Sequence, residues 1–135
     1  MVPGDVTTVS QNGHSDEPGP FTARQLFRID EALTAADRES GLSFSVYVGE
    51  LGEDSRATAE GLLDQLPEPP ESVLLAVDPE QRVVEIITGA TAGRRLPDRM
   101  CALAALSMTA AFGGGDLTGG TVTGLRMLAD QARSS

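Results

Sequence analysis

Side chains that commonly act as catalytic nucleophiles or bases are few in this sequence of 135 residues. It contains one histidine, His14, one cysteine, Cys101, and no lysine. Because His14 lies near the N-terminus, away from the predicted core, no Ser-His-Asp triad is expected, and a Walker-type phosphate loop needs a lysine. His14 is predicted to be a solvated side chain, and Cys101 an inert buried thiol in an apolar helix. The sequence therefore designates no catalytic residue.

Acidic residues follow two predicted strands and form the first candidate site. Glu50, Glu53 and Asp54 come after the first strand, and Asp78 comes after the second. If these strands are parallel, all four carboxylates lie beyond the carboxyl ends of the strands, where open α/β sheets form their binding crevice. A solvated acidic rim is the favoured alternative.

Arginines form the second group with functional potential. Arg94 and Arg95, together with Arg82 and Arg99, could hold an anionic group, because guanidinium groups bind carboxylates and phosphates in a forked geometry. Pairing with nearby carboxylates is the more common role of such residues, and it is the favoured alternative here.

The charge balance argues against nucleic acid as a partner. The sequence has 20 acidic and 10 basic residues and a formal net charge of −10, so a phosphate backbone would be repelled. The N-terminus lacks the charged start and apolar core of a secretory signal, and no apolar run is long enough to span a bilayer. The protein is therefore predicted to be cytoplasmic, with no membrane span.

The chain length predicts one domain over residues 16–135, preceded by a disordered tail over residues 1–15. Two β-rich runs around a turn predict a β-hairpin over Ser72–Gly89. A strand at 42–49, a helix at 55–66 and the first hairpin strand make a β-α-β unit, whose right-handed crossover makes its strands parallel. The hairpin adds an antiparallel strand, so the predicted sheet is mixed.

Helical periodicity predicts three further helices. A capping box precedes a helix over 23–39. The helix over 97–112 has few polar positions, which predicts that it is nearly enclosed. Glycines 113–115 end it, and Asp116 is predicted to cap a helix over 117–132. Since these glycines follow a helix, whereas a dinucleotide-binding motif follows a strand, no dinucleotide is expected.

Several stretches, taken in order, match one family pattern. They are Asp16–Thr22, Ser72–Gly89 with Arg82 after its turn, Leu96-Pro97-Asp98, Phe112–Asp116 and Gly119-Gly120. Together they resemble the TPM domain family over roughly residues 16–133. Within that family, the sequence is most similar to small stand-alone uncharacterised proteins of high-GC Gram-positive bacteria.

The resemblance implies a three-layer α/β/α sandwich in which a mixed sheet is flanked by about four helices. In relatives that hold a metal ion, acidic loop residues bind it, so the resemblance makes Ca²⁺ or Mg²⁺ the candidate cofactor. The positions that match recurring family acids are Asp16 and Asp98, with Glu71 as a looser match. Carboxylate ligands suit such hard cations, which can orient a phosphoryl group. Asp98 can instead complement the dipole of a helix in its first turn.

Two functions follow from these observations. The absence of a convincing set of acid, base and nucleophile favours a non-enzymatic TPM-like module that binds a protein partner, as an accessory or quality-control factor. The alternative is a phosphatase that depends on a divalent metal and acts on small phosphate esters, with Asp16 and Asp98 as ligands and an arginine at the phosphoryl group.

Overall fold

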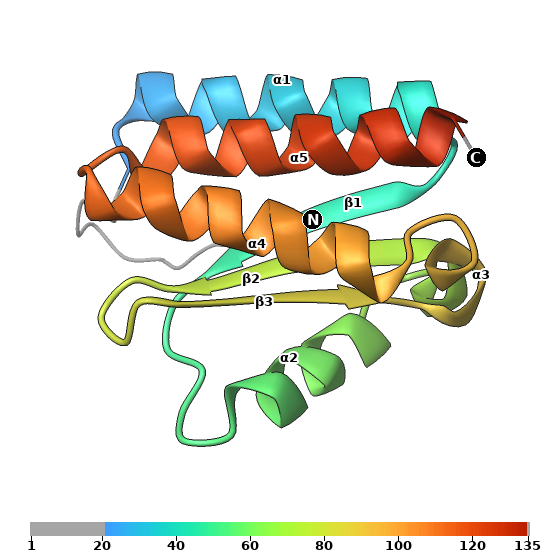
Figure 1. The fold of residues 1–135 in the computed structure, drawn as a ribbon, viewed down its shortest axis with the longest axis horizontal. Coiled ribbons are helices and arrows are strands. Elements are labelled where there is room, and N and C mark those ends of the chain that lie inside the picture. Colours follow the sequence, from blue (N-terminus) through green and yellow to red (C-terminus); the bar gives the residue numbers. More distant parts are fainter. Residues whose placement is uncertain (1–20, 135) are drawn as a thin grey trace.

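A three-stranded mixed sheet forms the middle layer of the fold in the computed structural model, which describes residues 21–134 (Figure 1). Its strands are β1 (Ser43–Val48), β2 (Ser72–Asp78) and β3 (Val83–Thr88). The central strand β2 is parallel to β1 and antiparallel to β3, which confirms the predicted β-α-β unit and hairpin. The predicted tail, residues 1–15, and the metal-ligand candidate Asp16 lie outside the described residues.

The strand β2 supplies side chains to both apolar cores of the domain. All of its residues are buried. Val73, Leu75 and Val77 belong to one core, whereas Leu74 and Ala76 belong to the other. Successive side chains of a strand point to opposite faces, so an uninterrupted apolar run is what a strand covered on both faces requires.

Three long helices cover one face of the sheet. They are α1 (Ala23–Ser40), α4 (Asp98–Gly113) and α5 (Leu117–Ser134). The middle helix is α5, which contacts both α1 and α4 (Figure 1). The prediction that α4 is nearly enclosed is wrong: only Ala104 and Met108 are fully buried, because α4 lies at the border of this layer and packs against α5 on one side only.

Glycines explain why α5, rather than the more apolar α4, occupies the middle. A Cβ atom on Gly124 would lie 2.5 Å from Sδ of Met108, and one on Gly120 would lie 2.7 Å from a ring carbon of Phe112. The two helices therefore approach more closely than larger side chains would permit. Buried positions on α5 include Leu125, and the helix buries residues on two sides rather than along one stripe.

A single long helix, α2 (Ser55–Asp64), covers the other face of the sheet, where it contacts β2 and β3. The second core lies beneath it and includes Leu51, Ala59 and Leu63. A 3₁₀ helix, η1 (Pro69–Glu71), precedes β2, and a short helix, α3 (Ala90–Gly93), follows β3. The four long helices and the layered α/β architecture were predicted, whereas α3 was not.

Side-chain caps fix the helix starts. Thr22 and Gln25 form the predicted capping box of α1. Asp54 caps α2 by accepting a hydrogen bond from the amide of Ala57 at 3.1 Å, and Ser55 is the first helical residue. Asp116 accepts a hydrogen bond from the amide of Gly119 at 2.8 Å, which confirms its predicted role at the start of α5.

Candidate functional site

The carboxylate of Asp78, one of the predicted acidic cluster, is a buried structural group that is 2% exposed. One of its oxygens accepts hydrogen bonds from the Leu51 amide at 2.9 Å and from Nε2 of Gln81 at 2.7 Å. The other accepts from the amides of Glu80 and Gln81, both at 3.2 Å. Burial alone would raise the pKa of Asp78, but these hydrogen bonds hold it below its ordinary value. Asp78 thus joins the β1–α2 loop to the hairpin turn.

The other acids of the cluster lie at the same end of the sheet, as their positions after parallel strands predicted. Glu50 and Glu53 are exposed in the loop before α2, and Asp54 is occupied as the cap of that helix. Among residues 21–134, no group of three or more His, Cys, Asp or Glu side chains is placed to hold a metal ion. At this end of the sheet, Asp54 and Asp78 hold loop structure through their hydrogen bonds.

Glu71 and Asp98, the described metal-ligand candidates, lie at the opposite end of the sheet. Glu71 is in η1, and Asp98 is the first residue of α4. Both are exposed. The 3₁₀ helix η1 packs against α3, which shortly precedes α4, so both acids belong to the same end of the molecule (Figure 1).

Three of the four arginines proposed to bind an anion, Arg82, Arg94 and Arg95, do not converge on one place. Arg82 lies in the β2–β3 loop with a φ of 58°, at the end of the sheet opposite to Arg94 and Arg95 (Figure 1). Nη2 of Arg95 donates a hydrogen bond to the carbonyl of Ala132 at 2.7 Å, in the last turn of α5, where a positive charge complements the helix dipole. Arg94 is exposed beside it.

The thiol of Cys101 is half-buried on α4. Burial raises its pKa, and the negative charge of Asp98 raises the pKa further, although the positive charge of Arg56 opposes these effects. A raised pKa keeps the thiol protonated near neutral pH, and the thiolate is the nucleophilic form. Cys101 is thus less buried than predicted, and its raised pKa agrees with the predicted inert thiol.

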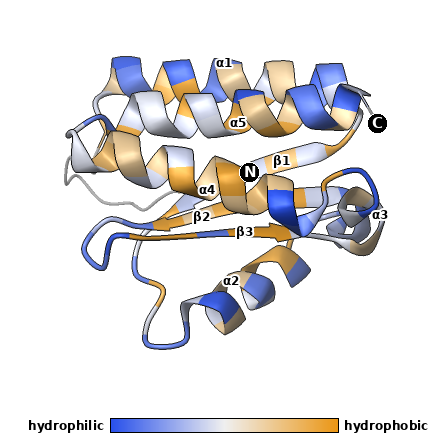
Figure 2. Cartoon of the chain, in the orientation of Figure 1, coloured by the Kyte–Doolittle hydropathy of each residue, from blue (hydrophilic) through white to orange (hydrophobic). Residues whose placement is uncertain are grey.

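The outer face of α4 is apolar and exposed. We define it by the exposed residues Arg99, Ala102, Leu103, Leu106, Thr109, Ala110 and Gly113. Leu106 is 68% exposed and Leu103 is 49% exposed. After Arg99 no charged residue occurs until Asp116, and Figure 2 shows hydrophilic colouring on α4 only near its N-terminal end. Within residues 21–134, every helix is too short or too polar to span a bilayer.

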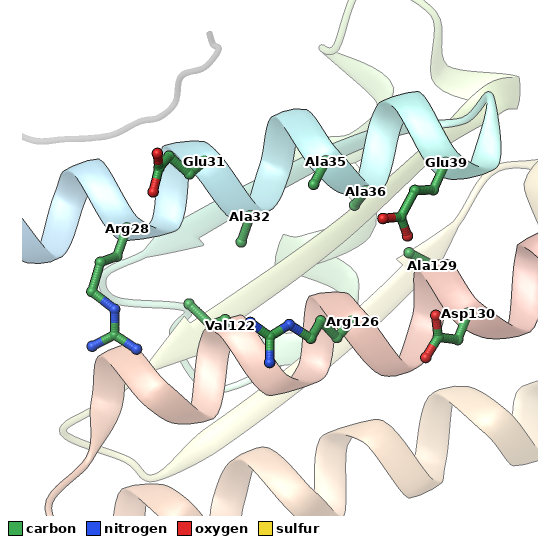
Figure 3. Close-up of a pocket in the computed structure, with 10 residues that line it drawn as sticks. All are labelled: Arg28, Glu31, Ala32, Ala35, Ala36, Glu39, Val122, Arg126, Ala129 and Asp130. Carbon is green, nitrogen blue, oxygen red and sulfur yellow. The ribbon is translucent and has the colours of Figure 1, made fainter.

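A groove of about 320 Å³ lies between α1 and α5 (Figure 3). Its lining residues are Arg28, Glu31, Ala32, Ala35, Ala36, Glu39, Val122, Arg126, Ala129 and Asp130. Alanines and Val122 form the floor, and charged side chains stand at its rim. We call this site the α1–α5 groove.

The sequence contained a partial signal for the α1–α5 groove. On α1, Arg28, Ala32, Ala35 and Glu39 are separated by three or four residues, so they lie on one helical face. The lining residues of α5 show the same spacing. Recognising a site also requires the knowledge that these two faces meet, and that contact joins the two ends of the described chain.

Residues 2–129 match the family Domain of unknown function (DUF5130). The chain belongs to this family. It is 32% identical over 125 residues to the Uncharacterized protein Rv2468c of Mycobacterium tuberculosis strain H37Rv. The aligned residues cover 93% of this chain and 75% of that protein. The Uncharacterized protein MT2543 of M. tuberculosis strain CDC 1551 matches with the same values. These relatives confirm the predicted link to uncharacterised proteins of high-GC bacteria.

Solved structures share the fold of this DUF5130 chain at low sequence identity. The BA42 protein from Bizionia argentinensis has a TM-score of 0.73 and 17% identity, with 89% of this chain and 86% of that chain covered. The N-terminal domain of cg2496 from Corynebacterium glutamicum has a TM-score of 0.70 and 16% identity, with coverage of 90% and 88%. The similarity supports the α/β fold alone.

Proposed function

We propose that this DUF5130 protein is a non-enzymatic, TPM-like module that binds a partner protein through the outer face of α4. The main support for this proposal is that Leu103 and Leu106 are 49% and 68% exposed, on a helix face that has no charge beyond Arg99. Single exposed apolar residues are normal on protein surfaces, whereas contiguous apolar patches mark interaction sites.

The shape of this face suits an apolar helix of the partner. Leu103 and Leu106 lie about one turn apart and form a ridge, which can enter the groove between side-chain rows of another helix. Ala102 and Ala110 beside the ridge permit close approach. Two copies of this chain, each with a formal charge of −10, would repel one another, which favours a different protein over a second copy.

Removing the ridge should abolish capture of the partner. We expect the double variant Leu103→Gln, Leu106→Gln to recover at least about tenfold less partner from extracts of the native host, because apolar anchors dominate interface energetics. Its stability should stay within about 0.5 kcal/mol of wild type, since the changed side chains are on the surface. Quantitative mass spectrometry of pull-downs measures the recovery.

The matched control is Leu26→Gln with Phe27→Gln, which removes the other exposed apolar pair, 50% and 61% exposed on α1. This control should retain the partner. Equal recovery by the α4 variant and wild type would contradict the proposal. Self-association of the purified protein that is lost in the α4 variant would also overturn it, because the occupant would then be a second copy.

The second candidate is a phosphatase that uses Ca²⁺ or Mg²⁺ and acts on small phosphate esters. It is supported by the shared location of the exposed acids Glu71 and Asp98 at one end of the molecule, near the exposed Arg94. Asp16 would have to supply a third carboxylate. Oxygen ligands from separate segments suit these cations, and an arginine can bind the phosphoryl oxygens.

Calcium or magnesium should then raise the melting temperature. A ligand that binds only the native state stabilises it by about 2.7 kcal/mol at 100 times its Kd, which corresponds to a shift of several degrees. Asp98→Asn should remove the shift, whereas Asp64→Asn on α2 should retain it. No shift at millimolar metal, or the same loss in both variants, would reject this candidate.

A further inference from the structure

Four of the five charged side chains that line the α1–α5 groove are separated into a positive and a negative end, and the fifth, Glu31, directs its carboxylate to the side of α1 away from α5 (Figure 3). The guanidinium groups of Arg28 and Arg126 lie on either side of Val122 (Figure 3). Farther along the same groove, the carboxylates of Glu39 and Asp130 face each other across Ala129. The groove is therefore bipolar, with an apolar floor between its charged ends.

Three of these four charged groups have no partner within the described part of the chain. Within residues 21–134, Arg28, Arg126 and Glu39 form no ion pair or side-chain hydrogen bond. Nη2 of Arg133 donates a hydrogen bond to Oδ1 of Asp130 at 3.2 Å. The arginines and acids of the groove thus do not neutralise each other, and both ends can accept a ligand of opposite charge.

The spacing of the two ends selects the length of the ligand. Val122 and Ala129 are seven residues apart on α5, which corresponds to about 10 Å along a helix with a rise of about 1.5 Å per residue. An extended peptide spans about 3.3–3.6 Å per residue, so about three residues bridge this length. Alanines in the floor leave space for a peptide backbone, and the groove volume of about 320 Å³ is at the small end of the range for ligand sites.

The charge of the whole molecule selects a zwitterion over a simple anion. With a formal charge of −10, the protein repels anions at long range, whereas a ligand without net charge suffers no such repulsion. A free peptide carries a carboxylate and an ammonium group at its two ends. It can satisfy the arginine end and the acidic end together.

We propose that the α1–α5 groove binds a short peptide with free termini, about three residues long and extended, with its carboxylate at Arg28 and Arg126 and its ammonium group at Glu39 and Asp130. This binding site is separate from the outer face of α4, and either proposal can fail without the other. The function it adds is recognition of small peptides by both termini.

A titration with trialanine tests the site, with binding followed by NMR of the amide signals of α1 and α5. We expect saturable binding with a Kd on the order of 0.1–1 mM, consistent with the limited affinity per atom of small ligands. N-acetyl-trialanine and trialanine amide should each bind about five- to tenfold more weakly, because each lacks one terminal charge. Dialanine, which is too short to reach both ends, should also bind more weakly.

Variants assign the two ends. Arg126→Gln should weaken the binding of trialanine about five- to tenfold. It should leave the already weaker binding of trialanine amide nearly unchanged, because the amide has no carboxylate to lose. Glu39→Gln should weaken the binding of trialanine but leave the binding of N-acetyl-trialanine nearly unchanged, because the acetylated peptide has no ammonium group to lose. Arg38→Gln and Asp64→Asn, which change charges outside the groove, serve as controls. Equal affinity for capped and free peptides, or no signal changes at 10 mM trialanine (roughly ten times the weakest expected Kd), would overturn the proposal.

Discussion

Replacing Gly89 with alanine should lower the free energy of unfolding by about 2–4 kcal/mol, because the added methyl group has no space. A Cβ atom on Gly89 would lie 2.6 Å from the carbonyl carbon of Pro70 and still closer to the carbonyl oxygen of Pro69. These are backbone atoms of η1, so they cannot move aside as a flexible side chain can. The amide of Gly89 also donates a hydrogen bond to the carbonyl of Ser72 at 2.9 Å.

The conformation of Gly89 is ordinary, with a φ of −70°, so the effect isolates close packing from backbone strain. Urea denaturation measures it as a lower midpoint with an unchanged slope. Gly61→Ala on α2 is the matched control, since a Cβ atom there meets no atom within 4 Å. It should stabilise the helix by about 0.5–1 kcal/mol. A neutral effect of Gly89→Ala would show that η1 separates readily from the β3–α3 junction.

The sequence predicts which local elements form better than it predicts which elements pack against one another. The hairpin is readable because the apolar run of β2 and the turn at Pro79 are local features. The burial of α4 was misjudged because a helix that is apolar all round is normally buried. Here the deciding residues are Gly120 and Gly124, which carry no apolar side chain but permit the close contact that makes α5 central.

The prediction of candidate sites from the sequence was limited in the same way. The positions of Asp54, Asp78 and Asp116 followed from the predicted strands and helices, but their hydrogen bonds, which occupy all three carboxylates, depend on loop geometry. The α1–α5 groove depends on a contact between helices that are far apart in sequence. Helical spacing shows that Arg28 and Glu39 share a face of α1, but it does not show that Arg126 faces them.

The largest effect of a single polar substitution should come from Asp78→Asn. Two hydrogen-bond donors meet each carboxylate oxygen of this buried residue. An asparagine NH₂ group in place of one oxygen would face two donors and leave them unsatisfied. Because a buried unsatisfied polar group costs about 1–3 kcal/mol, we expect a loss of about 2–4 kcal/mol in the free energy of unfolding. Asp116→Asn is the control, since asparagine caps a helix about as well as aspartate.

The pH dependence of the stability loss caused by Asp78→Asn separates the effect of the carboxylate charge from the effect of the side-chain shape. The native pKa of Asp78 is lowered by its hydrogen bonds, so its ionised form adds stability above the unfolded pKa of about 3.9. That contribution disappears as the pH falls below about 4 and through the native pKa. Wild type should therefore lose stability more steeply than Asp78→Asn below about pH 4, and the two should converge. The burial that raises the pKa of Asp37 is common to both proteins and cancels in the comparison. A constant difference between pH 7 and pH 2.5 in urea denaturation would show that the charge of Asp78 contributes nothing, and that its shape alone holds the loop to the hairpin.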